Sequence, residues 1–124
     1  GKNFLIAEDN GINLDMLKEL LKEEGAACDC AKNGMAAVDL FRHSKKGQYD
    51  LIFMDVQMPD MDGYEATRAI RQMKHPDAKD IPIVAMTANA FSNDVKAAFD
   101  CGMNAHLAKP VNIDRIKDIV ANFT

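Results

Sequence analysis

The chain has 124 residues, a length that fits one domain with a hydrophobic core of its own. Its 48% of hydrophobic and 27% of charged residues place it among soluble globular proteins. The net charge is −4 and no continuous basic stripe is present, so the sequence gives little support to direct binding of nucleic acid. No hydrophobic run is long enough for a membrane span, and no signal peptide precedes the first run. We therefore predict a single domain over residues 1–124, located in the cytoplasm.

The chain has three cysteines, Cys28, Cys30 and Cys101. Their number is odd, and their spacing matches neither a zinc site nor a C-x-x-C redox motif. We predict that they are small residues in or near the core of a protein from a reducing compartment.

In the first half of the chain, short hydrophobic runs alternate with amphipathic segments. Residues 4–7 form a predicted buried strand, and leucines at helical spacing follow it until Gly25 ends the helix. A weaker strand covers about residues 26–31, and Asn33 is a candidate cap for a second helix. Residues 51–54 are the third predicted strand.

The second half begins with the same alternation. Residues 64–73 are a predicted helix, and the polar residues 74–80 are a predicted surface loop. His43 and His75 fall at a polar helix end and in that loop, so both are expected at the surface. Residues 83–86 are the fourth predicted strand.

The last part of the chain completes the pattern. Ser92 is a candidate cap for a helix that has Val95, Ala98 and Phe99 on one face and ends near Gly102. Residues 105–108 are a short fifth strand, and hydrophobic residues at helical spacing then predict a last helix that reaches Phe123. Strands and helices that alternate in this way predict a parallel sheet covered by helices on both faces.

Polar residues stand at the ends of four of these strands. Glu8 and Asp9 follow the first strand, Asp55 the third, Thr87 the fourth and Lys109 the fifth. In an open α/β sheet, ligands bind beyond the carboxyl ends of the strands, where the strand order reverses. We therefore expect these residues to meet in one crevice.

The chemistry of this set points to phosphoryl transfer. Three carboxylates against one lysine invite a divalent cation, and ligation by a few oxygen atoms suits Mg²⁺. In-line transfer needs a nucleophile, a metal and donors for the phosphoryl oxygens. Asp55 fits the nucleophile, Asp9 a metal ligand, and Thr87 and Lys109 the donors.

Each residue also has a plain structural alternative. The stretch Glu8-Asp9-Asn10 is also compatible with a turn that caps a helix. Taken alone, Thr87 is compatible with a capping hydroxyl and Lys109 with a solvated surface residue. Asp60 and Asp62 are predicted to be turn residues rather than ligands, because Asx chemistry suits the tight loop before Gly63.

With these residues together, the chain resembles the receiver domain of two-component response regulators over its whole length. The matching stretches are Glu8-Asp9, Asp55 with Met58-Pro59 and Met61-Asp62-Gly63, Thr87-Ala88, and Lys109-Pro110. The resemblance implies a (βα)₅ fold, which is a doubly wound, flavodoxin-like parallel sheet with strand order 2-1-3-4-5.

The resemblance also implies a role for each site residue. Asp55 would be phosphorylated by a phosphohistidine donor, Thr87 would swing toward the phosphoryl group, and Lys109 would pair with it. The implied Mg²⁺ ligands are Asp9, Asp55, the backbone carbonyl of Gln57 and, through water, Glu8. Such domains catalyse both their own phosphorylation and their dephosphorylation. The Lys109-Pro110 peptide bond is a candidate for the cis form.

In detail the sequence is most similar to receivers attached to hybrid sensor histidine kinases. The stretches that carry this similarity are 8–10, 54–59, 87–90, 102–104 and 106–110. The implied partner is a histidine kinase or a histidine phosphotransfer protein, and the implied location is the cytoplasmic part of a membrane-bound sensor kinase. A stand-alone receiver would have nearly the same sequence.

One position departs from the family pattern. Three places before the lysine the family usually has a Tyr or Phe that turns inward with the threonine, and this chain has His106. We predict a switch made of Thr87 and His106, in which the imidazole adds a titratable group. Gln57 and Asn89 occupy places where the family tunes hydrolysis of the phosphoryl-aspartate.

Three other functions are compatible with parts of the pattern. A flavodoxin-like cofactor binder shares the fold, but Glu8 and Asp9 would repel a flavin phosphate. A phosphatase with an aspartyl intermediate has a second aspartate two places after the nucleophile, where this chain has Gln57. A pseudo-receiver that only docks protein partners is the remaining alternative, although the complete set of strand-end residues favours phosphorylation.

Overall fold

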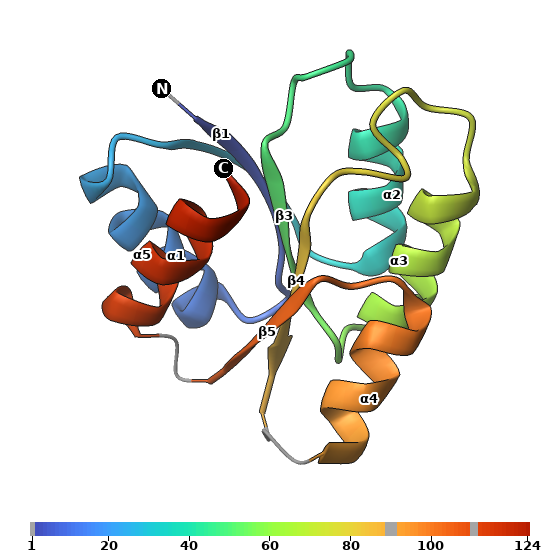
Figure 1. Cartoon of the computed structure of the whole chain (residues 1–124). Helices are drawn as coiled ribbons and strands as arrows, with labels where there is room; N and C mark the ends of the chain where they lie inside the picture. The colour runs from blue at the N-terminus through green and yellow to red at the C-terminus, as the bar shows by residue number, and fades with distance from the viewer. Residues whose placement is uncertain (1, 89–91, 110–111) are drawn as a thin grey trace.

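The computed structural model describes residues 2–88, 92–109 and 112–124, with the side chains of 92–94 left out. The strands are β1 Asn3–Ala7, β2 Ala27–Ala31, β3 Leu51–Asp55, β4 Ile83–Thr87 and β5 Ala105–Ala108. The helices are α1 Gly11–Glu23, α2 Gly34–Arg42, α3 Gly63–Gln72, α4 Ser92–Cys101 and α5 Ile113–Phe123. All strands pair in parallel in the order β2-β1-β3-β4-β5, which confirms the predicted topology (Figure 1).

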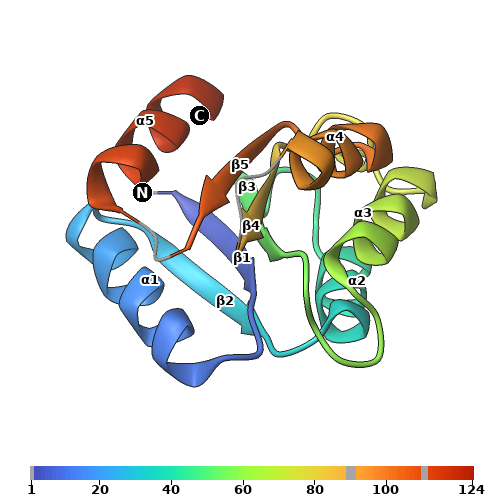
Figure 2. The same ribbon diagram turned by 90° about the horizontal axis from the view of Figure 1, so that it is seen from below.

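Helices cover both faces of the sheet. Figure 2 shows α1 and α5 on one side and α2, α3 and α4 on the other. Two hydrophobic clusters fill the spaces between these layers, one on each face of the sheet. Strands β3 and β4 are buried at every position, as expected for central parallel strands that lie between two layers of helices.

The register of the sheet brings the predicted site residues to one edge. Ala7 pairs with Met54, so Glu8 and Asp55 follow at the same level, and Thr87 pairs with Ala108, directly before Lys109. At the opposite edge the two ends of the chain meet, because Lys2 Nζ donates to the backbone oxygen of Thr124 at 3.1 Å. The sheet therefore separates its candidate site from its termini.

The loop predicted over residues 74–80 is not simply a surface loop. Ala78 is 1% exposed and belongs to the core cluster under α2 and α3. His75 is half-buried, and the centroid of its ring lies 4.4 Å from that of Phe41. Its Nε2 lies 2.9 Å from the backbone oxygen of Ser44, and its Nδ1 accepts from the backbone N–H of Asp77. The predicted exposure of His75 is wrong, because the loop folds back over the end of α2. His43 is exposed, as predicted.

The inner face of α4 also differs from the prediction. Phe99 is 48% exposed, whereas Ala98 and Cys101 face the core. The side chains that α4 contributes to the core are thus small, and the phenylalanine lies outside that contact. The predicted cap Ser92 lies outside the described side chains.

The cysteines lie in or near the core, as predicted. Cys101 is buried, Cys28 and Cys30 are partly buried, and all three are free thiols. Burial raises the pKa of Cys28 to about 11, with a smaller contribution from Cys30, so the thiolate that reacts with oxidants is scarce at neutral pH. Among the described residues, no helix is long and apolar enough to cross a membrane.

Candidate functional site

A closely packed loop follows Asp55 at the end of β3. Asp60 has a left-handed backbone with φ of 68°, and Asp62 caps α3 in a capping box, which confirms that these two aspartates are turn residues. Gly63 then passes so close to Asp55 that an added Cβ would lie 2.2 Å from the Asp55 carbonyl oxygen. The loop of residues 56–62 is therefore fixed against the strand that carries Asp55.

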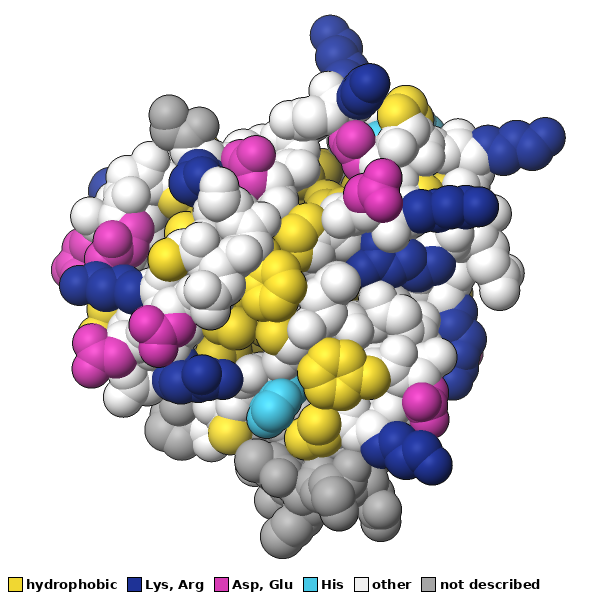
Figure 3. Space-filling view, viewed as in Figure 1, with side chains coloured by type: hydrophobic (Ala, Val, Ile, Leu, Met, Phe, Trp, Pro, Cys, Tyr) yellow, Lys and Arg dark blue, Asp and Glu magenta, His cyan; other side chains and the backbone are white. Residues whose placement is uncertain are grey.

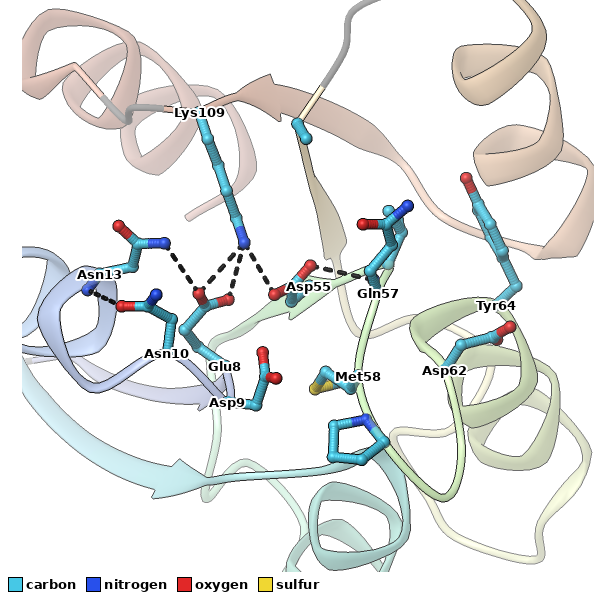
Figure 4. A pocket seen from close by; sticks show the side chains of 13 residues that line it. Glu8, Asp9, Asn10, Asn13, Asp55, Gln57, Met58, Asp62, Tyr64 and Lys109 are labelled. Atoms are coloured by element: carbon cyan, nitrogen blue, oxygen red, sulfur yellow. Dashed lines mark hydrogen bonds and ion pairs between the residues drawn. The ribbon is translucent and has the colours of Figure 1, made fainter.

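The predicted residues from β1, β3 and β5 open into one crevice, as Figure 4 shows. Its polar lining includes Glu8, Asp9, Asn13, Asp55, Gln57 and Lys109. These side chains come from segments that are far apart in the chain, and only the parallel sheet brings them together.

Lys109 links two buried carboxylates in this crevice. Its Nζ donates to Asp55 Oδ2 at 2.7 Å and lies 3.1 Å from both Glu8 oxygens. The side chains of Glu8 and Asp55 are only 1% and 3% exposed, whereas that of Lys109 is 21% exposed. One ammonium therefore serves two carboxylates that have little contact with water.

The pKa values follow from this shortage of positive charge. Burial raises the pKa of Glu8 to about 7, and a hydrogen bond and the charge of Asp55 act in the same direction. Burial alone would lower the pKa of Lys109, but its bonds to Asp55 and Glu8 outweigh that effect and raise it. The negative charge of the carboxylates thus exceeds the positive charge of the single ammonium, and this excess favours the binding of an additional cation.

The carboxylates can supply ligands for such a cation. Oxygen atoms of Glu8, Asp9 and Asp55 all lie within 4.8 Å of one another. Hard oxygen donors in a partly open site suit Mg²⁺, which keeps some of its water ligands. The Gln57 N–H donates to Asp55 Oδ1 at 3.0 Å and fixes that carboxylate, while the ligand role of the Gln57 carbonyl stays a prediction.

Thr87 and His106 lie beside the crevice rather than in its lining. Thr87 is 1% exposed, and its Oγ1 has no hydrogen-bond partner among residues 2–88, 92–109 and 112–124. His106 is half-buried in β5 and pairs with Ala85, so the alternation along the strands places it on the same sheet face as Thr87. The predicted contributions of Asn89 and of the Lys109-Pro110 bond lie outside the described residues.

Sequence reasoning missed Asn13. Its Nδ2 donates to Glu8 Oε1 at 3.2 Å, and its backbone N–H donates to the side chain of Asn10, the cap of α1. The available signal was its position three residues after the cap, where the first turn of the helix faces the end of β1.

The comparisons with known proteins agree with this geometry. The family model described as "Response regulator receiver domain" matches residues 4–121. Hybrid signal transduction histidine kinase B of Dictyostelium discoideum is 41% identical over 124 residues, which cover 93% of this chain. The match spans 6% of the length of that kinase, so the chain corresponds to a small part of it.

Two solved structures show the same fold. The receiver domain of a sensor histidine kinase from Pseudomonas aeruginosa, with magnesium coordinated in its active site cleft, is 33% identical with a TM-score of 0.89, over 99% of this chain and 97% of that one. A second match comes from the Saccharomyces cerevisiae complex of the histidine phosphotransfer protein Ypd1 with the receiver domain of its downstream response regulator Ssk1. It is 33% identical with a TM-score of 0.86, over 98% and 88% of the two chains. The chain therefore belongs to the response regulator receiver domain family of two-component signalling.

Proposed function

We propose that the chain, as one receiver domain over residues 1–124, is the phosphoacceptor of a phosphorelay, with Asp55 as the accepting residue. The observation that carries this proposal is the contact of 2.7 Å between Asp55 and Lys109, inside a crevice that holds two further carboxylates. Asp55 is fixed and almost dehydrated, and its immediate surroundings contain both a cation and candidate metal ligands.

In the proposed reaction, a carboxylate oxygen of Asp55 attacks the phosphorus of a phosphohistidine. The new bond joins that oxygen to phosphorus, and the bond between phosphorus and the imidazole nitrogen of the donor breaks. The Gln57 N–H holds Asp55 in place through Oδ1, and Lys109 offsets negative charge on the transferring group. The Thr87 hydroxyl, which has no hydrogen-bond partner in the described part of the chain, supplies a donor for a phosphoryl oxygen once the group has arrived.

A bound Mg²⁺ would neutralise charge on the phosphoryl oxygens, and Glu8, Asp9, Asp55 and the Gln57 carbonyl are the groups that would hold it. The same residues support hydrolysis of the acyl phosphate, in which water attacks the phosphorus, the bond between phosphorus and the Asp55 oxygen breaks, and inorganic phosphate leaves. The domain would thus catalyse its own phosphorylation and dephosphorylation.

The proposed donor or acceptor partner is a histidine kinase or a histidine phosphotransfer protein. The yeast neighbour was solved in complex with a phosphotransfer protein, and the Dictyostelium relative is a hybrid kinase, which supports this class of partner for the present chain. The cytoplasmic part of a membrane-bound sensor kinase remains the proposed setting. A pseudo-receiver that only docks partners would need neither the buried Asp55 nor the lysine beside it.

Intact-mass spectrometry after incubation with acetyl phosphate tests the proposal. We expect one added phosphoryl group in the presence of Mg²⁺, and none when Mg²⁺ is chelated or in Asp55→Asn, which keeps the shape of the side chain but removes the nucleophile. Beryllofluoride binding is measured in parallel, because fast hydrolysis can hide the adduct. If wild-type chain shows neither adduct nor beryllofluoride binding, it is a docking-only pseudo-receiver.

Thr87 and His106 are the proposed switch that carries the signal away from Asp55. They lie on the sheet face that α4 covers, and Figure 3 shows hydrophobic side chains gathered over β5 between α5 and α4. Phe99 on α4 is also exposed. If this surface carries the output, a partner protein has to contact it. A phosphoryl group that draws Thr87 inward would change the space that His106 occupies.

We expect that in His106→Ala the structural change caused by beryllofluoride stays within the crevice. In wild-type chain, beryllofluoride should shift backbone amide NMR signals in the crevice and also in α4, β5 and α5. In His106→Ala only the crevice signals should shift, whereas the surface variant His43→Ala should behave as wild type. Equal propagation into α5 in both chains would rule out His106 as part of the switch.

A further inference from the structure

Asn13 connects α1 to the acid cluster. Its Nδ2 donates to Glu8 Oε1 at 3.2 Å, and its backbone N–H donates to Asn10 Oδ1 at 3.0 Å. Figure 4 shows the Asn13 side chain on the side of Glu8 that faces away from Asp55. The cap of the helix therefore fixes the place of the amide, and the amide fixes one oxygen of Glu8.

Glu8 has a second donor, but it shares that donor with Asp55. Lys109 Nζ lies 3.1 Å from each Glu8 oxygen and only 2.7 Å from Asp55 Oδ2. A phosphoryl group on Asp55 would add negative charge and acceptor oxygens beside this ammonium. Lys109 would then be drawn toward the phosphoryl group, whereas the amide of Asn13 lies on the far side of Glu8 and keeps its partner in both states.

An amide suits this position better than a second cation. It donates a hydrogen bond without neutralising the carboxylate, so the negative charge of Glu8 stays available to a divalent cation. Groups that orient the residues around a metal ion usually control its affinity, even though they do not touch it.

We propose that Asn13 is a positioning residue that holds Glu8 in the orientation that serves Mg²⁺, and that it thereby sets the affinity of the crevice for this ion. The inference rests on the proposed function for the identity of the ion. It assigns to the first turn of α1 a role in the site that the sequence pattern alone does not show.

The test is Asn13→Ala in the 124-residue chain, titrated with MgCl₂ by isothermal calorimetry. We expect the Kd for Mg²⁺ to rise about tenfold. The Mg²⁺ concentration that half-saturates phosphorylation by acetyl phosphate should rise by a similar factor, while the rate at saturating Mg²⁺ stays within about twofold of wild type. The lost hydrogen bond to Glu8 lowers stability, whereas the better helix propensity of alanine raises it, so the Tm should change little.

Two further variants make the result specific. Asn13→Leu has a similar size but no donor and should lose affinity as Asn13→Ala does, whereas Asn122→Ala makes the same change at an exposed position of α5 and should bind Mg²⁺ as wild type. Unchanged affinity in both Asn13 variants, with a wild-type chain that binds Mg²⁺ and accepts phosphoryl, would overturn the role of Asn13 and leave the proposed function standing. A lowered Tm with unchanged Kd would also overturn it, in favour of a structural role. If wild-type chain neither binds Mg²⁺ nor accepts phosphoryl, both proposals fail.

Discussion

Replacing Lys109 by methionine is expected to lower the free energy of unfolding by about 2–4 kcal/mol at pH 8, because removing one partner of a buried ion pair leaves the other uncompensated. Here two carboxylates lose their cation, since Lys109 Nζ contacts both Glu8 and Asp55 and both are at most 3% exposed. We place the effect at the lower end of the range for buried pairs because the lysine itself is 21% exposed. Urea denaturation followed by circular dichroism measures it.

The loss should depend on pH in a defined direction. Burial and the neighbouring Asp55 raise the pKa of Glu8 from its ordinary value of 4.5 to about 7. A carboxyl whose pKa is raised on folding costs stability as pH rises from the unfolded value through the folded one, because the native state must give up a proton that it prefers to keep. Without Lys109 this cost is larger, so the difference in free energy of unfolding between Lys109→Met and wild type should be larger at pH 8 than at pH 6.

A matched lysine shows whether the buried site causes the effect. Lys117 pairs with Glu24 at 3.6 Å on the surface, with a side chain that is 55% exposed. Lys117→Met should change the free energy of unfolding by no more than about 0.5 kcal/mol. Millimolar Mg²⁺ should restore part of the stability of Lys109→Met and have little effect on the difference at Lys117. Equal losses at the two positions would contradict the electrostatic picture of the crevice.

Gly63→Ala is expected to cost about 2–3 kcal/mol of stability, the upper part of the usual range for overpacking, and to slow phosphorylation of Asp55 at least about tenfold. The added Cβ would lie 2.2 Å from the Asp55 carbonyl oxygen and 2.9 Å from Val56 Cα. Both neighbours are backbone atoms, so the end of β3 itself must shift and the Asp55 carboxylate with it. Chemical denaturation and the rate of acetyl phosphate labelling measure the two effects.

Gly11→Ala is the control for this substitution. A Cβ at Gly11 meets no atom of the described residues within 4 Å, and alanine is a better helix former at the first position of α1. We expect its stability to equal or slightly exceed that of wild type, with unchanged labelling. Similar labelling rates in Gly63→Ala and wild type would show that the loop adjusts without moving Asp55.

The features that could be predicted from the sequence are those that depend on continuous residue patterns. Buried parallel strands are unbroken hydrophobic runs, so β3 and β4 and the polar residues that end them could be located from the letters alone. The carboxyl ends of parallel strands share one edge of a sheet, which is why Glu8, Asp55 and Lys109 could be placed together without coordinates.

Other features depend on tertiary contacts that no periodicity encodes. His75 is half-buried and Ala78 is buried because a polar-looking loop folds back on α2. Phe99 is exposed because α4 turns the small side chains of Ala98 and Cys101 to the core instead. Asn13 reaches Glu8 through a single side-chain contact across a turn, a pairing that composition and spacing cannot distinguish from an exposed helix residue. The distances between side chains in the crevice likewise depend on the folded backbone and could not be predicted from the sequence.

The two ends of the chain meet at the edge of the sheet that is remote from the crevice. This position determines where an attached polypeptide would leave the domain. Lys2 and Thr124 are joined by a hydrogen bond there, so any polypeptide attached to either end would leave the domain on the side away from Asp55. Linkers would act as a tether at the back of the domain, around which the crevice can swing between a donor and an acceptor at high effective concentration. Fluorescent tags or immobilisation anchors can be fused at both ends for the same reason, without obstructing the approach of a partner.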